Sequence, residues 1–231
     1  MNDLKNLMNK LNIDGVEEKL ETLERYMEEV LKWNEKVNLT AITDREEFIQ
    51  KHFVDSLLCA ETLEFTASSS INDVGTGGGF PGVPLAVCYP DKDFVLMDSL
   101  AKRIRIVQQI CDELGIKNVR AVHGRAEDLA RLDEYRDGFD LCVSRAVANM
   151  RVLCEYCMPF VKDGGYFIAY KSADCESEIN DARNAVRLLG GEDPEIRQLP
   201  HLGHSLVVIK KNGLTPDAYP RKAGTPSKNP L

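Results

Sequence analysis

Long apolar runs are absent from this sequence. No stretch approaches the roughly 18 consecutive apolar residues that a membrane-spanning helix needs, so we expect no membrane contact. The first residues, MNDLKNLMNKLNIDG, are polar and mixed in charge, unlike a secretory signal. We therefore expect a cytoplasmic protein.

Metal ligands are also scarce. The chain has 4 histidines and 7 cysteines, and only Cys154 and Cys157 have CxxC spacing. No second pair of this kind and no His-x-x-x-His follows, so a zinc site lacks ligands and we expect no metal. The helical periodicity around these two cysteines favours buried thiols over a redox pair.

The chain has no excess of positive charge. Its formal net charge is −8, with 29 Lys and Arg against 37 Asp and Glu. This argues mildly against a protein that coats nucleic acid. A local basic surface stays possible, because binding depends on where the charges lie and not on their sum.

Residues 1–64 are expected to form an N-terminal helical extension. Apolar residues recur at three- and four-residue steps in 16–37, which predicts an amphipathic helix packed on a core. A coiled coil is disfavoured, since the pattern lasts about three heptads. A second helix is predicted over 44–60, with Asp44 as its N-cap and Glu47 as the capping-box partner.

From residue 70 the pattern changes, after a predicted linker at 64–70. Short apolar runs alternate with helical segments, which is typical of a parallel sheet with helices on both faces. The predicted strands are 71–74, 94–98, 118–122, 139–144 and 166–171. The predicted helices are about 82–89, 100–114, 125–132, 148–160 and 174–190.

The C-terminal end departs from this alternation. The strand-like runs 194–200 and 204–211 are too close for a crossover helix, so they predict an antiparallel hairpin. A mostly parallel, seven-stranded α/β sheet that ends in such a hairpin is the Rossmann-like fold of class I S-adenosylmethionine-dependent methyltransferases. We assign this domain to 70–211, and we expect 212–231 to be an extended, basic, proline-containing tail.

A glycine-rich turn follows the first predicted strand in DVGTGGGFPG. Gly75 and Gly77 allow a tight turn and a close approach to a ligand. A dinucleotide fingerprint has a third glycine where this chain has Phe80. Asp73 would also repel a pyrophosphate, at a cost of about 1 kcal/mol. The same carboxylate suits the ammonium and sulfonium groups of S-adenosylmethionine, directly or through water.

Two later strand ends carry further candidate cofactor residues. Asp98 ends the second strand, where a carboxylate can bind both ribose hydroxyls. Its alternative role is capping of the next helix, which Ser99 could also perform. After the third strand, Ala126 or Glu127 could meet the adenine edge, although Glu127 could equally belong only to a first helical turn.

Six segments together resemble one family. The chain is similar to the bacterial small-subunit ribosomal RNA methyltransferase G family, formerly glucose-inhibited division protein B. The segments are NLTAI (38–42), KHFVDSL (51–57), DVGTGGGFPGVPLA (73–86), LMDSLAKR (96–103), VSRAVA (143–148) and YPRKAGTPSKNPL (219–231).

The resemblance implies methyl transfer from S-adenosylmethionine to N7 of a guanine in the 530 loop of 16S rRNA. The implied partner is 16S rRNA or the 30S subunit, and we expect a monomer. The resemblance places cofactor contacts at Gly75, Phe80, Ala126, Glu127 and Arg145. Many relatives have proline where this chain has Gly78, so we expect a more flexible loop here.

Arg145 is the candidate for positioning the substrate. It ends the fourth strand, at the edge where ligands bind in open parallel sheets, and could hold a guanine edge or a phosphate. Its alternative role is an ion pair with Asp73 or Asp98. Guanine N7 has a free lone pair, so we expect in-line transfer with no base, no covalent intermediate and no role for cysteine.

Basic residues near the same edge are candidates for RNA binding, although each singly is more often a solvated surface charge. They are Lys102, Arg103, Arg105, Arg125, Lys171, Arg221, Lys222 and Lys228. His52 and Asp55 could form a local hydrogen bond or line the substrate cleft.

Three alternative functions stay open. The first is a class I methyltransferase that acts on another RNA or on a small molecule. The second is a nicotinamide oxidoreductase, disfavoured by Asp73 and the terminal hairpin. The third is an RNA-binding assembly factor without catalysis, disfavoured by Gly75, Gly77, Asp98 and Arg145.

Overall fold

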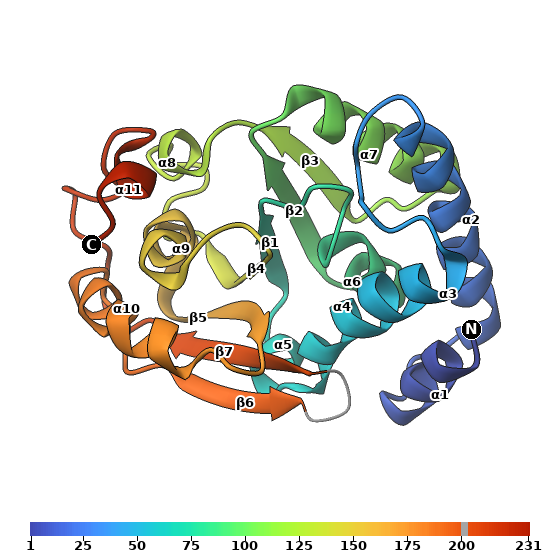
Figure 1. Ribbon diagram of the computed structural model, residues 1–231, viewed down its shortest axis with the longest axis horizontal. Coiled ribbons are helices and arrows are strands. Elements are labelled where there is room, and N and C mark those ends of the chain that lie inside the picture. Colours follow the sequence, from blue (N-terminus) through green and yellow to red (C-terminus); the bar gives the residue numbers. More distant parts are fainter. Residues whose placement is uncertain (200–202) are drawn as a thin grey trace.

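A computed structural model describes residues 1–199 and 203–231. In this part of the chain, seven strands form one sheet in the order β3-β2-β1-β4-β5-β7-β6. β1 to β5 pair in parallel, and β7 pairs antiparallel with both β5 and β6 (Figure 1). The predicted fold class, a mostly parallel sheet that ends in an antiparallel hairpin, is confirmed.

The strands lie close to their predicted positions. They are β1 (Ser70–Val74), β2 (Asp93–Asp98), β3 (Val119–His123), β4 (Phe139–Arg145), β5 (Val161–Ser172), β6 (Glu195–Leu199) and β7 (His204–Lys210). β5 starts five residues earlier than predicted, because Val161 pairs with Phe139 before a register shift in the β4–β5 ladder. Residue 200 of the predicted hairpin lies outside the described residues.

Helices connect the parallel strands. They are α6 (Gly82–Cys88), α7 (Ala101–Leu114), α8 (Ala126–Leu129), α9 (Met150–Cys157) and α10 (Glu176–Leu188), with a 3-10 turn η3 (Met158–Phe160) after α9. α8 is only one turn long, so the prediction of 125–132 was too long. α7 ends at Gly115, which adopts the left-handed conformation that favours glycine at a helix C-terminus.

The two faces of the sheet bury two separate clusters of apolar side chains. Successive residues of a strand point to opposite faces. Leu141 and Val143 of β4 accordingly pack with α6, α7 and the N-terminal helices, while Cys142 packs in the cluster of α8 to α10. The N-terminal helices therefore share a core with one face of the sheet.

The N-terminal extension begins with α1 (Asn2–Lys10) and α2 (Val16–Asn34), which confirms the amphipathic helix. The second predicted helix is instead divided into α3 (Arg45–Phe48), a π-helix η1 (Ile49–Val54), α4 (Asp55–Leu57) and a 3-10 turn η2 (Leu58–Glu61). Asp44 caps its start by accepting from Glu47 N at 2.9 Å. The side chain of Glu47 pairs with Lys51 instead of completing the capping box.

The predicted linker at 64–70 was wrong. Thr62 caps a further turn of helix, α5 (Leu63–Thr66), by accepting from Phe65 N, and β1 already starts at Ser70. The buried Lys92 ammonium donates to the carbonyls of Thr66 and Ser68, which fixes the short connection. None of the described helices has the length and apolarity to span a membrane.

The tail is folded back and not extended as predicted. It ends in a short helix, α11 (Thr225–Lys228), which lies beside α8 and α9 (Figure 1). The guanidinium of Arg136 donates to the carbonyls of Thr215 and Tyr219, and Arg221 pairs with the buried Glu155. The bonds from Arg136 satisfy backbone carbonyls that an extended tail would leave to water, and Arg221 compensates the charge of the buried Glu155.

Candidate functional site

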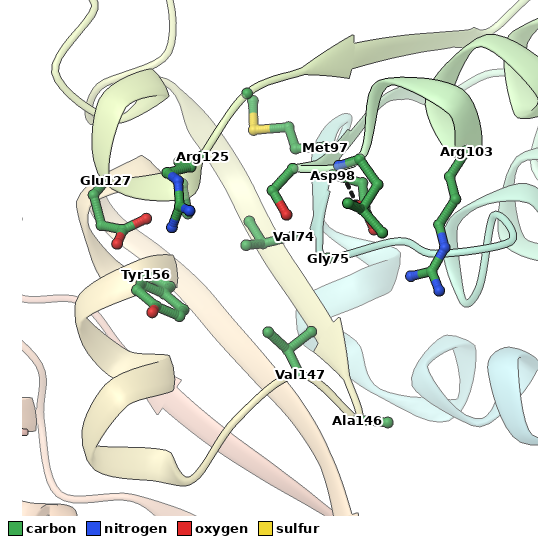
Figure 2. A pocket seen from close by; sticks show the side chains of 14 residues that line it. Val74, Gly75, Met97, Asp98, Arg103, Arg125, Glu127, Ala146, Val147 and Tyr156 are labelled. Atoms are coloured by element: carbon green, nitrogen blue, oxygen red, sulfur yellow. Dashed lines mark hydrogen bonds between the residues drawn. The ribbon is translucent and has the colours of Figure 1, made fainter. Parts of the chain in front are cut away.

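A cavity of about 300 Å³ lies at the C-terminal ends of β1, β2 and β4, and we call it the glycine-loop pocket. Figure 2 shows Asp98 and Arg103 on one side of it and Glu127, Arg125 and Tyr156 on the other. Its lining residues are Val74, Gly75, Met97, Asp98, Ser99, Leu100, Arg103, Gly124, Arg125, Ala126, Glu127, Ala146, Val147 and Tyr156. This position matches the ligand site of open parallel sheets.

Gly75 is the point where the chain turns out of β1. Its φ is +76°, and a Cβ built on it would lie 2.3 Å from Cγ2 of Val147. Gly77, two residues on, also has a positive φ of +59°, but a Cβ there would meet nothing within 4 Å. Of these two glycines, Gly75 is the one that combines a backbone requirement with a steric one.

Asp98 anchors the glycine loop to the end of β2. Its Oδ2 accepts from Gly77 N at 3.0 Å, and its Oδ1 accepts from Leu100 N at 2.8 Å. The second bond closes a turn just before α7 and does not cap it. The N-cap of α7 is Leu100, with no side-chain capping hydrogen bond, so neither Asp98 nor Ser99 has the capping role that the sequence left open. A carboxylate can accept about four hydrogen bonds, so both oxygens keep acceptor capacity on the pocket side.

Asp73 lies beneath the loop and does not line the pocket. It is fully buried, and its Oδ2 accepts from Thr76 Oγ1 at 2.7 Å and from Gly82 N at 2.9 Å. Burial raises the pKa of this carboxyl to about 6, and these two hydrogen bonds oppose the rise. Its Oδ1 has no hydrogen-bond partner in the described chain. Of the two expected contacts with a cationic ligand, the direct one does not fit this buried position, and the one through water stays a prediction.

Glu127 connects the pocket to the C-terminal tail. Its side chain is buried, and its Oε1 accepts from Gly224 N at 2.8 Å. Ala126 lies beside it in the pocket wall. Tyr156 of α9 lies below Glu127 at the same end of the pocket (Figure 2). This end of the pocket thus depends on residues from α8, α9 and the tail.

A second cavity, of about 410 Å³, adjoins the first at Ala146, which lines both. We call it the Arg145 pocket. Its lining residues are Lys51, His52, Asp55, Arg145, Ala146, Tyr170, Lys171, Ser172, Glu178 and His204. Segments distant in sequence supply them, namely η1 with α4, the end of β4, the paired ends of β5 and β7, and the first turn of α10.

Arg145 is held by a hydrogen-bond network at the centre of this pocket. Its Nη1 donates to Asp55 Oδ2 at 2.5 Å and to the Lys51 carbonyl at 2.9 Å, and its Nη2 lies 3.2 Å from His52 Nδ1. Asp55 Oδ1 in turn lies 2.7 Å from His204 Nδ1. The expected alternative was an ion pair with Asp73 or Asp98, and the observed partner is Asp55.

His52 joins the network to the glycine loop. Its ring stacks on Phe80 at a centroid distance of 4.2 Å, and its Nε2 lies 2.7 Å from Thr40 Oγ1. Burial and the neighbouring Arg145 lower the pKa of His52 to about 3, so the ring is neutral at neutral pH. The local hydrogen bond expected between His52 and Asp55 is replaced by contacts that both make with Arg145.

The predicted site residues thus fall into two groups. Gly75, Asp98, Ala126 and Glu127 line the glycine-loop pocket. The others lie outside it: Gly77 is bonded to Asp98, Asp73 lies under the loop, Phe80 is buried against His52, and Arg145 lines the neighbouring pocket.

The predicted basic residues have different surroundings. Lys102, Arg125, Lys222 and Lys228 are exposed, and Arg103 lines the pocket while its Nε donates to the Asn38 carbonyl. Lys171 donates to Glu178 and the Ala148 carbonyl. Arg221 binds Glu155, whose side chain is 0% exposed. Its charge is compensated inside the protein, which argues against the RNA-binding role predicted for it.

Sequence reasoning missed several residues that line the two pockets. His204 and Tyr170 come from strands that were recognised, but it is the packing of α4 on the end of the sheet that brings His204 to Asp55 and Tyr170 to the Ser56 carbonyl. Val147 and Tyr156 follow β4 in a loop and in α9. Glu178 looked like any acidic residue in the first turn of a helix, and no sequence pattern marked it.

The described cysteines are all buried and unpaired, and neither pocket has one in its lining. This agrees with the preference for buried thiols over a redox pair at Cys154 and Cys157. No group of three His, Cys, Asp or Glu residues suited to a metal ion occurs in the described ranges.

Comparison with known proteins identifies the family. The family model described as "rRNA small subunit methyltransferase G" matches residues 19–205. The chain belongs to this family. It is 48% identical to the ribosomal RNA small subunit methyltransferase G of Clostridium novyi, over 90% of this chain and 87% of that protein. It is 43% identical to the protein of the same name in Desulforamulus reducens, over the full length of both.

Solved structures agree with the fold. The S-adenosylmethionine-dependent methyltransferase SibL, solved in its apo form, matches with a TM-score of 0.58 at 17% identity, over 73% of this chain and 57% of that one. The predicted resemblance to methyltransferase G and the predicted class I methyltransferase fold are both confirmed. As a member of the methyltransferase G family, the chain is an enzyme.

Proposed function

We propose that this chain transfers the methyl group of S-adenosylmethionine to N7 of a guanine in the 530 loop of 16S rRNA. The observation that supports this most is the junction of two pockets at Ala146, because it gives a methyl donor and an acceptor base separate sites that meet. The names of the relatives support an RNA substrate. We expect the partner to be the 30S subunit or its 16S rRNA, and the enzyme to act as a cytoplasmic monomer.

The glycine-loop pocket has the groups that an S-adenosyl nucleoside requires. Asp98 offers acceptor capacity for two ribose hydroxyls, and Gly75 leaves no side chain between the loop and a ligand. Ala126 and Glu127 would lie at the adenine end. S-adenosylmethionine supplies an electrophilic methyl group on its sulfonium.

Asp73 acts on this ligand indirectly. Its two hydrogen bonds tie the glycine loop to the start of α6, so it holds the loop in the shape that Asp98 and Gly75 need. The unpartnered Oδ1 leaves one acceptor for an ordered water. The carboxylate that precedes the glycine turn is then a positioning residue.

The chemistry in the Arg145 pocket is mainly positioning. Guanine N7 has an in-plane lone pair and no proton, so no general base is required. The task of the protein is to hold N7 about 3 Å from the methyl carbon, in line with the departing sulfur. Arg145 is fixed by Asp55 and His52 and can offer its guanidinium to the base or to a phosphate.

The basic residues in and beside the glycine-loop pocket would contact the RNA backbone. Arg103 and Arg125 line the glycine-loop pocket from opposite sides (Figure 2). Lys102 precedes Arg103 in the first turn of α7. Lys222 adds an exposed charge from the tail. Each such phosphate contact makes the binding more sensitive to salt.

Asp98→Asn tests the cofactor site, with Asp93→Asn at the exposed start of the same strand as its matched control. Calorimetric titration with S-adenosylmethionine should show at least a tenfold weaker affinity for D98N, because hydrogen bonds to a charged group are each worth about 1.5–3 kcal/mol. D93N should bind like the wild type. Equal affinities for both variants would contradict the assignment.

Tritiated methyl transfer tests the substrate. Wild-type enzyme should label small subunits from which the methyl group is missing, and cleavage mapping should find a single 7-methylguanine in the 530 loop. A label elsewhere, or no label, would contradict the proposed function.

A further inference from the structure

Two carboxylates line the Arg145 pocket, and they differ in the number of oxygen atoms that are free to accept a hydrogen bond from a ligand. Asp55 has both oxygens engaged, one by Arg145 and one by His204, and its side chain is 2% exposed. Glu178, in the first turn of α10, is 24% exposed. Its Oε1 accepts two hydrogen bonds, while its Oε2 has no partner in the described part of the chain.

Glu178 is also held rigidly. Lys171 Nζ, at the end of β5, donates to its Oε1 at 2.6 Å, and Met150 N, at the start of α9, donates to the same atom at 2.6 Å. Two donors from separate elements fix the orientation of the carboxylate. The unused Oε2 is therefore a pre-oriented acceptor in the pocket wall.

Lys171 provides the complementary donor. Its ammonium has three N–H groups, of which one binds Glu178 and one binds the Ala148 carbonyl at 2.8 Å. One N–H is left. The pair thus presents a donor and an acceptor side by side on one wall of the pocket.

We propose that Lys171 and Glu178 together recognise the O6 and N1–H edge of the target guanine. This rests on the proposed function. Guanine has its O6 acceptor next to its N1–H donor, and its N2 amino group adjoins N1. Lys171 Nζ donates to O6, and Glu178 Oε2 accepts from N1–H and N2–H. Adenine presents a donor and a lone pair in the reverse order, so both contacts become repulsive.

The same pair favours the reaction as well as the base. Methylation of N7 places positive charge on the guanine ring and makes N1–H a stronger donor. The hydrogen bond to Glu178 is therefore stronger in the transition state than in the bound substrate, which lowers the barrier. N7 itself receives no hydrogen bond, and its lone pair stays open to the methyl group.

A purely structural role would use the same Oε1 contacts, because they join β5, α9 and α10. A structural role and a base-recognition role predict different methylation rates when the target base is changed. Inosine keeps O6 and N1–H but lacks the N2 amino group. We therefore compare methylation of small subunits that carry guanosine or inosine at the target position, reconstituted from site-substituted 16S rRNA.

Wild-type enzyme should methylate the guanosine subunits with a kcat/KM about tenfold higher than the inosine subunits, from one lost hydrogen bond to a charged group. E178Q should lose about 100-fold on guanosine, with the guanosine preference falling to near one and the affinity for S-adenosylmethionine unchanged. E176Q, an exposed residue of the same helix turn, should behave like the wild type.

Equal rates on both substrates by the wild type would overturn the recognition of N2, whether or not E178Q folds. An E178Q enzyme with an unchanged guanosine preference would assign Glu178 a structural role only. Failure of the wild type to methylate guanosine subunits at all would instead reject the proposed function itself.

Discussion

Arg145 and Asp55 form an ion pair in which Nη1 lies 2.5 Å from Oδ2, with side-chain exposures of 13% and 2%. The residues are 90 positions apart, at the end of β4 and at the start of α4. Removing one partner of a buried pair leaves an uncompensated charge, which costs more than the pair itself is worth. The N-terminal helices are thus joined to the end of the sheet at the point where the two pockets meet.

Asp55→Asn tests this connection. The free energy of unfolding should fall by about 3 kcal/mol, and methyl transfer should fall more than tenfold because Arg145 loses its fixed position. The affinity for S-adenosylmethionine should change little, since neither residue lines the glycine-loop pocket. Asp91→Asn, at an exposed position, is the control for urea unfolding and activity. Wild-type stability in D55N would contradict the argument.

Gly75→Ala and Gly77→Ala separate backbone strain from steric conflict. Both positions have positive φ, so each alanine should cost about 1 kcal/mol in unfolding free energy. Only the alanine at position 75 also meets Val147. G75A should be less stable than G77A and should lose most of its affinity for S-adenosylmethionine.

Val147→Ala in the G75A background gives the sharper test, because it removes the methyl group that the new Cβ would meet. The double variant should recover stability to about the level of G77A in urea unfolding. A G75A enzyme with the stability and affinity of G77A would reject the steric account.

Arg221→Met and Lys222→Met distinguish a structural cation from an RNA-binding one. R221M leaves the buried Glu155 without its partner and should lower the unfolding free energy by about 3 kcal/mol. The adenine end of the pocket should also loosen, because Gly224 of the same tail is bonded to Glu127. K222M should keep its stability and lose some RNA affinity and salt dependence, measured by filter binding at several salt concentrations. A stable R221M with weaker RNA binding, together with an unstable K222M, would contradict the structural role of Arg221 and the RNA-binding role of Lys222.

Asp73 predicts a specific pH dependence of stability. The carboxyl has a pKa of about 6 when folded and an ordinary value near 3.8 when unfolded, so the native state binds more protons between these values. Its contribution is complete below about pH 4 and is lost as the pH rises through 6, for a total of roughly 3 kcal/mol. Subtracting the unfolding free energies of D73N from those of the wild type at each pH isolates this change. A flat difference from pH 4 to 7 would contradict the buried, raised-pKa carboxyl.

The sheet could be predicted from the sequence because its signals are local. Apolar runs that end in Asp73, Asp98 and Arg145 mark strands whose C-terminal ends meet at one edge, and the short spacing of the last two strands requires a hairpin. The irregular shape of the predicted helix over 44–60 could not be read from the sequence, because no local pattern marks a π-helical turn. Its shape follows from tertiary contacts, such as that between His52 and Phe80.

The site could be predicted only in part, because the directions of its side chains also depend on tertiary contacts. Strand ends correctly indicated where Gly75 and Asp98 lie, but the direction of a carboxylate is decided by its neighbours. Asp73 faces the loop from below, where Thr76 and Gly82 bind it. Arg221 belongs to a tail whose composition resembles that of an extended basic segment, yet the buried Glu155 binds it inside the fold.

The most direct test of this account is a crystal structure of the enzyme with S-adenosylhomocysteine. The account predicts ribose hydroxyls on Asp98, the adenine beside Ala126 and Glu127, and the sulfur directed toward Ala146 and the Arg145 pocket. A ligand bound elsewhere, or one whose sulfur points away from Arg145, would contradict it.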